Sequence, residues 1–177
     1  MADHNYFELF DIPVSFRPDL SSLKKKYFAL SRKYHPDYVA MKEDQAQQDA
    51  LAMTGWINKA YATLSDTHLR TKYIIGLYGL LSEEDNQSMP QAFLMEMMDI
   101  NESIMDLQMD FDASQYKKIM AQISLMEENL QHDMDRLAEQ FEIDLHRLSV
   151  VKEIKDNYLK SKYLLRIREN VATFAHH

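Results

Sequence analysis

Apolar residues in the first third of the chain recur at steps of three and four, the spacing that places side chains on one face of a helix. Asp19 is a good N-cap, and the helix that follows it must end before Pro36, because proline disfavours the helical conformation in the residue before it. A short aromatic helix over 6–10 comes first and ends before Pro13. The buried stripe expected for the second helix is Leu20, Leu23, Tyr27, Leu30 and Tyr34.

Two further helices complete the expected N-terminal domain. A stripe from Ala50 to Leu64 predicts a long third helix, antiparallel to the second. Asp66 or Thr67 can cap a shorter fourth helix that reaches Leu77. The following polar segment ends in Pro90, so we expect a first domain over 1–79 and a linker over 80–90.

The second half of the chain carries three longer apolar stripes. One runs from Phe93 to Phe111 and the next from Tyr116 to Phe141, while a last helix is expected from about Leu148 to Val171. These stripes predict a three-helix bundle over 91–177. Since the chain has only three glycines and four prolines, we expect an all-α protein with two helical domains.

Composition narrows the possible functions. The chain has no cysteine, which excludes disulfides, thiolate metal sites and cysteine nucleophiles and fits a reducing compartment. The residues from Met1 to Phe10 read as folded sequence rather than as a targeting segment, and no apolar run approaches the roughly 20 residues of a membrane span. A net charge of −8 disfavours nucleic acid as a partner. We therefore expect a cytoplasmic protein that binds neither membrane nor nucleic acid.

Catalytic and metal-binding patterns are missing from the sequence. Helical bundles can hold two irons through paired Glu-x-x-His motifs, but the chain has no such motif, and His132 and His146 stand apart. It also has no recognisable serine nucleophile motif and no glycine-rich phosphate loop. We expect no enzymatic activity, no cofactor and no metal site.

One segment opposes the overall negative charge. Five basic residues and no acidic residue lie between Lys24 and Lys33. Lys25 and Arg32 are seven residues apart, as are Lys26 and Lys33, so each pair shares a helical face after two turns. Such a face is either simply solvated or binds an acidic protein surface.

His35-Pro36-Asp37 follows this basic helix directly. Together with the four helices expected over Asn5–Leu77, and with Asn58-Lys59-Ala60-Tyr61, the arrangement resembles the J domain. The resemblance implies that His35, Pro36 and Asp37 contact a seventy-kilodalton heat-shock chaperone of the HscA/DnaK type and stimulate its ATPase. It also implies that Lys25, Lys26, Arg32 and Lys33 pair with an acidic surface of that chaperone.

The helix expected from Phe93 carries a second apolar set, out of phase with its core stripe. Its members are Leu94, Met98, Met105 and Met109, with Met95 farther around the helix. A helix packed between two neighbours would need such a wide apolar arc. The alternative is a surface that binds a partner, and methionine suits such a surface because it adapts its shape.

The segment Phe93-Leu94-Met95-Glu96-Met97-Met98 resembles the C-terminal domain of the HscB-type co-chaperones of iron–sulfur cluster biogenesis. This resemblance favours the partner-binding interpretation and implies that the partner is the IscU-type cluster scaffold. The matching contact residues are Leu94, Met95, Met98, Asp99, Glu102, Asp106 and, on the last helix, Tyr163. The function implied is delivery of the scaffold to the chaperone, which aids cluster transfer. The alternative is a J-domain adaptor that delivers another client.

Overall fold

The computed structural model describes residues 5–35, 44–81 and 89–174, and the regular elements in these ranges are all helices. The all-α prediction is therefore confirmed for the described residues. The chain forms two compact units, 1–74 and 75–177, and most of the expected linker lies outside the described ranges. The helices are α1 (Tyr6–Leu9), α2 (Leu20–Lys33), α4 (Asp44–Ser65), α5 (Thr67–Leu77), α6 (Gln91–Met109), α7 (Ala113–Ile143) and α8 (Arg147–Phe174).

The short helix α1 is fixed at its start and buried along one side. The Asn5 side chain accepts from the backbone N–H groups of Phe7 and Glu8, and the Glu8 side chain accepts in return from the backbone of Asn5. The Tyr6 N–H donates to the Tyr73 hydroxyl at 2.8 Å, and the two rings stack with centroids 4.4 Å apart. Because Phe7 is also fully buried, α1 is held against α5 although it has only one turn.

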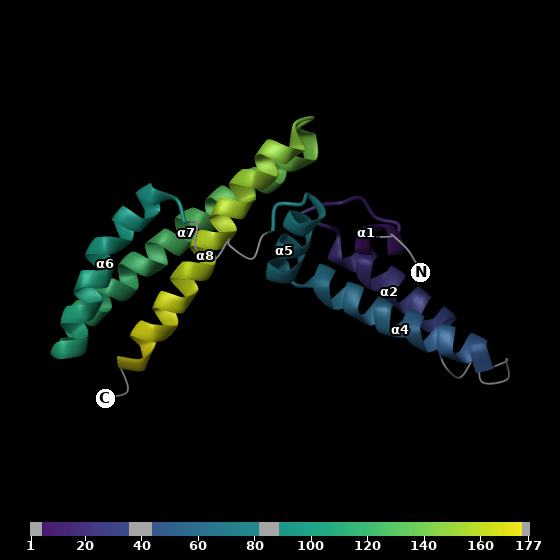
Figure 1. Cartoon of the computed structure of the whole chain (residues 1–177), viewed down its shortest axis with the longest axis horizontal. Coiled ribbons are helices and arrows are strands. Elements are labelled where there is room, and N and C mark those ends of the chain that lie inside the picture. The colour runs from purple at the N-terminus through teal and green to yellow at the C-terminus, as the bar shows by residue number, and fades with distance from the viewer. Residues whose placement is uncertain (1–4, 36–43, 82–88, 175–177) are drawn as a thin grey trace. The chain divides into compact units, whose positions relative to one another are not determined.

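Helices α2 and α4 form the antiparallel pair that was expected from the sequence (Figure 1). Near the middle of α2, Tyr27 stacks on Tyr61 at 4.1 Å and donates from its hydroxyl to Asn58 Oδ1 at 3.1 Å. At the end of α2, the Thr54 hydroxyl donates to the Tyr34 carbonyl at 3.0 Å. Since the contacts move backward along α4 as they move forward along α2, the two helices run in opposite directions.

Two details of this pair differ from the sequence-based expectation. Leu20 was expected in the buried stripe but is half exposed, because it lies in the first turn of α2, at the end of the helix pair. Helix α4 begins at Asp44, six residues before Ala50, where the apolar stripe starts. The added residues include Gln45, Gln47 and Gln48, which favour helix without contributing to an apolar stripe.

A buried arginine connects α5 to the rest of the first unit. Arg70 is almost fully buried, and its guanidinium donates to the carbonyls of Phe16 at 3.1 Å and Leu64 at 2.7 Å. It also donates to the Thr67 hydroxyl at 3.2 Å. Burial lowers the pKa of the guanidinium, but these acceptors compensate for the water that it loses. Arg70 therefore joins the loop before α2, the end of α4 and the start of α5.

The second unit contains the expected bundle of α6, α7 and α8, in which each helix contacts the other two. The long helices α7 and α8 lie side by side (Figure 1) and are linked by Arg168, which donates to Glu127 Oε1 at 2.9 Å and to the Ser124 hydroxyl at 2.7 Å. The shared core contains Phe93, Met97, Ile100, Ile104, Leu107, Ile119, Ile123, Leu164 and Val171. The bundle thus buries one continuous set of side chains from all three helices.

Phe111 is a correction to the expected stripe of α6. The sequence pattern placed it on the buried face, but about half of its side chain is exposed. Helix α6 ends at Met109, and Asp110 has an extended backbone, so Phe111 no longer follows the helical spacing.

Replacing Arg70 with methionine is expected to lower the free energy of unfolding of the first unit by about 2–4 kcal/mol, because two buried carbonyls lose their donors. Lys72→Met, on the exposed side of the same helix, is the matched control and is expected to change stability little. Urea unfolding followed by circular dichroism measures both. Equal midpoints for the two variants would show that Arg70 does not hold this unit together.

Candidate functional site

Helix α2 presents a basic surface on the side away from α4. Lys25, Arg32 and Lys33 are exposed, whereas Leu23 on the opposite side is fully buried. Arg32 and Lys33 lie in the last turn, where cations interact favourably with the negative end of the helix dipole. The Lys33 ammonium lies 5.2 Å from the centre of the Tyr34 ring. The basic face that was read from the sequence is therefore outward-facing at these three positions.

Lys26 is half buried and has a partner in the loop before α2. Its ammonium bonds the Asp11 carbonyl oxygen and lies 3.2 Å from the Asp11 carboxylate. Asp11 has a left-handed backbone with φ of 48°, and this conformation turns the chain after α1. Lys26 thus holds the loop that precedes α2, a role that its sequence position did not reveal.

His35 lies directly after α2 and is exposed. Its N–H donates to the Arg32 carbonyl at 3.4 Å, and the carbonyl of the preceding Tyr34 is held by Thr54 of α4. These two bonds fix the backbone on which the imidazole is carried, next to the exposed cations of the last helical turn. Pro36 and Asp37 lie outside the described residues, so the remainder of the predicted contact loop stays a prediction.

Phe28 is an exposed aromatic residue that the sequence analysis missed. About 54% of it is exposed, and it lies between Lys24 and Arg32, four residues from each. Its ring lies 5.4 Å from that of Tyr27. The signal was present in the sequence, because an apolar residue directly after Tyr27 is out of phase with the buried stripe. The basic surface therefore contains an apolar element.

The outer face of α6 carries the second candidate surface. Leu94, Met95 and Met98 are exposed, while Phe93 and Met97 of the same two turns are buried in the bundle core. The two sets point to different sides of the helix, so the apolar residues outside the core stripe are not needed for packing against α7 and α8. The second apolar set of α6 is therefore a solvent-facing surface and not part of a wide arc buried between two neighbouring helices.

Carboxylates border this apolar surface along one side. Asp99, Glu102 and Asp106 are all exposed and follow one another at steps of three and four, so they form a row on α6. The row lies next to Met95 and Met98, on the side away from Asn101, which contacts α8. The structure thus brings six of the seven predicted contact residues onto one face.

Tyr163 lies on α8 and borders the same face from its other side. Its hydroxyl accepts from Asn101 of α6 at 3.1 Å, and its ring packs edge-on against Phe93 at 5.7 Å. Asn101 is one helical turn from Met98, so Tyr163 lies close to the apolar surface. Tyr163 is half buried against the bundle core, which the sequence pattern did not predict, and it fixes α6 against α8.

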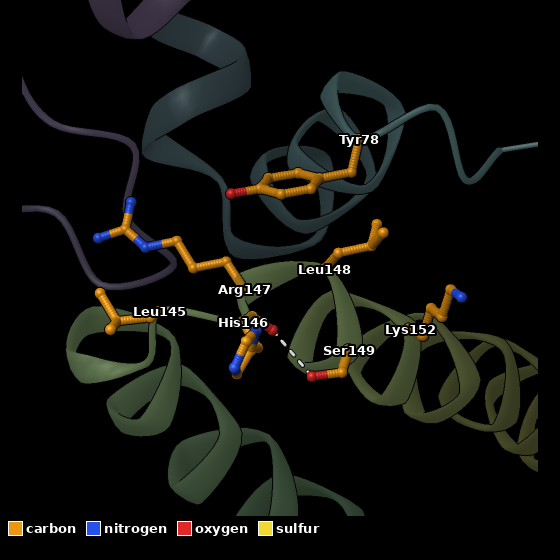
Figure 2. A pocket seen from close by; sticks show the side chains of 7 residues that line it. All are labelled: Tyr78, Leu145, His146, Arg147, Leu148, Ser149 and Lys152. Atoms are coloured by element: carbon orange, nitrogen blue, oxygen red, sulfur yellow. Dashed lines mark hydrogen bonds between the residues drawn. The ribbon is translucent and has the colours of Figure 1, made fainter.

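A pocket at the turn between α7 and α8 is separate from both surfaces (Figure 2). Its lining includes Tyr78, Leu145, His146 and Arg147, and the Ser149 hydroxyl donates to the His146 carbonyl at 2.8 Å. None of its lining residues was singled out as a binding residue in the sequence analysis. The pocket therefore shares no residue with either candidate surface.

The described residues contain neither a metal-binding cluster nor a membrane-spanning helix. Over 5–35, 44–81 and 89–174, no three His, Asp or Glu side chains are grouped so that they could hold a metal ion. Within the same ranges, no helix is long and apolar enough to cross a membrane.

Two family models match this chain, one in each half. The DnaJ domain matches residues 5–73, which contain the basic surface and His35. The HSCB C-terminal oligomerisation domain matches residues 89–172, which contain the whole of α6, α7 and most of α8. The two matches therefore include both candidate surfaces.

Several curated bacterial proteins are similar to this chain. The co-chaperone protein HscB of Proteus mirabilis is 29% identical over 169 residues, which are 94% of this chain and 93% of that protein. A co-chaperone protein HscB homolog of Vibrio cholerae is 36% identical over 101 residues. That second alignment covers 56% of this chain and 59% of the relative's length.

Solved structures match over nearly the whole chain. Human co-chaperone protein HscB has a TM-score of 0.71 at 25% identity, covering 98% of this chain and 83% of the human one. The chaperone HscB from Vibrio cholerae has a TM-score of 0.65 at 26% identity, covering 98% of both chains. The family models, relatives and structures agree with the resemblance found in the sequence. The chain therefore belongs to the HscB-type family of J-domain co-chaperones.

Proposed function

We propose that this protein is a co-chaperone of iron–sulfur cluster biogenesis, acting in the bacterial cytoplasm. The outer face of α6 binds an IscU-type scaffold protein, and the basic surface of α2 with the loop after it binds a chaperone of the HscA/DnaK type. By holding both partners, the protein delivers the scaffold and stimulates the chaperone's ATPase, which aids cluster transfer. The observation that carries the proposal is the exposed apolar surface of α6 beside its row of carboxylates.

The α6 surface has the chemistry of a specific protein contact. Its centre is apolar, so burying it against a partner removes Leu94 and Met98 from water, which is worth up to about 1.5–3 kcal/mol for each fully buried side chain. Asp99 and Glu102 at its edge select a partner that carries basic residues there. A matching scaffold surface therefore has an apolar strip bordered by lysine or arginine.

The α2 surface suits an acidic partner. Lys25 and Arg32 lie on the same side of the helix and are both exposed, so they can steer association with a negatively charged surface. His35 is carried at the end of this side, on backbone that is held by hydrogen bonds to both α2 and α4. The catalytic groups for ATP hydrolysis belong to the chaperone, and this protein acts by binding.

His35→Gln is expected to reduce stimulation of the chaperone ATPase at least about tenfold, the effect of losing about 1.4 kcal/mol of contact energy. His68→Gln is the matched control, since His68 is an exposed histidine on α5 outside the basic surface. Steady-state ATP hydrolysis by an HscA-type chaperone measures both variants. Full stimulation by His35→Gln would exclude this histidine from the chaperone contact.

Leu94→Ala combined with Met98→Ala is expected to weaken scaffold binding about 30-fold, because two truncated side chains lose about 2 kcal/mol of burial. Leu125→Ala combined with Leu165→Ala is the control, as both leucines are similarly exposed on α7 and α8. Isothermal titration with an IscU-type scaffold measures the dissociation constants. If the α6 pair binds as tightly as the wild type, the scaffold does not use this face, and the adaptor alternative gains support.

A further inference from the structure

The apolar stripe on the outer side of α6 continues beyond the residues assigned to scaffold binding. Leu94, Met98, Met105 and Met109 follow one another at steps of four, seven and four, so they lie on one side of the helix. Their exposed fractions are 41%, 66%, 65% and 90%. At 1.5 Å per residue the stripe is about 22 Å long, and only its first third belongs to the surface proposed above.

Packing within the bundle does not account for Met105 and Met109. The core side of α6 in these turns is supplied by Ile104 and Leu107, which are 5% and 1% exposed. The two methionines are on the other side and leave large apolar surfaces in water. Since such surfaces are favourably removed from water by a partner, their alignment with Leu94 and Met98 marks one line of exposed apolar residues, with Asn101 and Glu102 beside it in the turn between Met98 and Met105.

The carboxylate row accompanies this continuation. Glu102 lies one turn before Met105, and Asp106 lies one turn before Met109, so each methionine has an acidic neighbour on the same edge. Asp99 and Glu102 lie one turn after Met95 and Met98, so the methionines of the first part also have acidic neighbours on this edge. The chemistry of the first part of the strip, apolar with an acidic edge, is therefore repeated along the second part.

We propose that Met105 and Met109 extend the apolar part of the scaffold-binding face about 16 Å beyond Met98, beside Glu102 and Asp106 and toward the C-terminal end of α6. The occupant is the same IscU-type scaffold, whose apolar strip with a basic border spans the full stripe. This inference rests on the proposed function. Unbranched, polarisable methionine side chains suit the far end of such a contact, because they adjust to the partner's shape.

The first test replaces both methionines with glutamine, which has a similar length and helix propensity but is polar. Met105→Gln combined with Met109→Gln is expected to weaken scaffold binding about tenfold, as measured by titration calorimetry with an IscU-type scaffold. Leu125→Gln combined with Leu165→Gln is the matched control and is expected to bind like the wild type. Circular dichroism verifies that each variant keeps its helices.

The second test uses the absence of cysteine from the chain, which makes an introduced thiol a unique labelling site. An environment-sensitive dye on Met109→Cys is expected to shift its emission to shorter wavelength when the scaffold is added, because the partner removes it from water. The same dye on Leu125→Cys is expected to keep its emission. This measurement reports contact directly and does not depend on a loss of affinity.

The outcomes separate this inference from the proposed function. If the Leu94 and Met98 alanine variant loses scaffold binding while the Met105 and Met109 variant keeps it and the dye does not respond, the extension is wrong and the function stands. If the wild type does not bind the scaffold, both are overturned. Weakened binding together with a dye response at position 109 supports the extended face.

Discussion

A helix at the edge of a three-helix bundle can bury only one of its sides, and this constraint governs what the second unit can do. In α6 the buried side is already complete, with Phe93, Met97 and Ile100 packed among residues of α7 and α8. Any further apolar residue on α6 must face water or a partner. The bundle therefore supports a second apolar strip on α6 that is not needed for packing. Tyr163 of α8 fixes the orientation of α6 through its hydrogen bond with Asn101.

In the first unit, the residues proposed to bind the chaperone are mostly polar, and their positions depend on the helix pair beneath them. Tyr27 and Thr54 set the alignment of α2 on α4, and the bond from Thr54 reaches the carbonyl next to His35. Arg70 joins α5 to the loop before α2, so the surface is supported from both ends of the helix. Residues outside the proposed chaperone contact thus determine where His35 is presented.

Much of the fold followed from periodicity, because unbroken stripes such as Phe93 to Leu107 leave little choice of structure. The two surfaces were also accessible from sequence, as both lie out of phase with a core stripe. The exposure of Leu20 and Phe111 could not be predicted from the sequence, because it depends on where a helix and its neighbours end. The hydrogen bond between Asn101 and Tyr163 and the contact of Lys26 with Asp11 leave no local sequence pattern. Each joins residues that only the folded chain brings together.

The bond between Lys26 and Asp11 has a consequence for the rate at which the protein meets an acidic partner. Electrostatic steering depends on the field that reaches solvent, and a cation paired with a neighbouring carboxylate contributes little to it at a distance. Lys26 therefore belongs to the architecture of the loop, while Lys25, Arg32 and Lys33 supply the outward field. The ionic-strength dependence of the association rate should therefore reflect the other exposed cations of this helix and little contribution from Lys26.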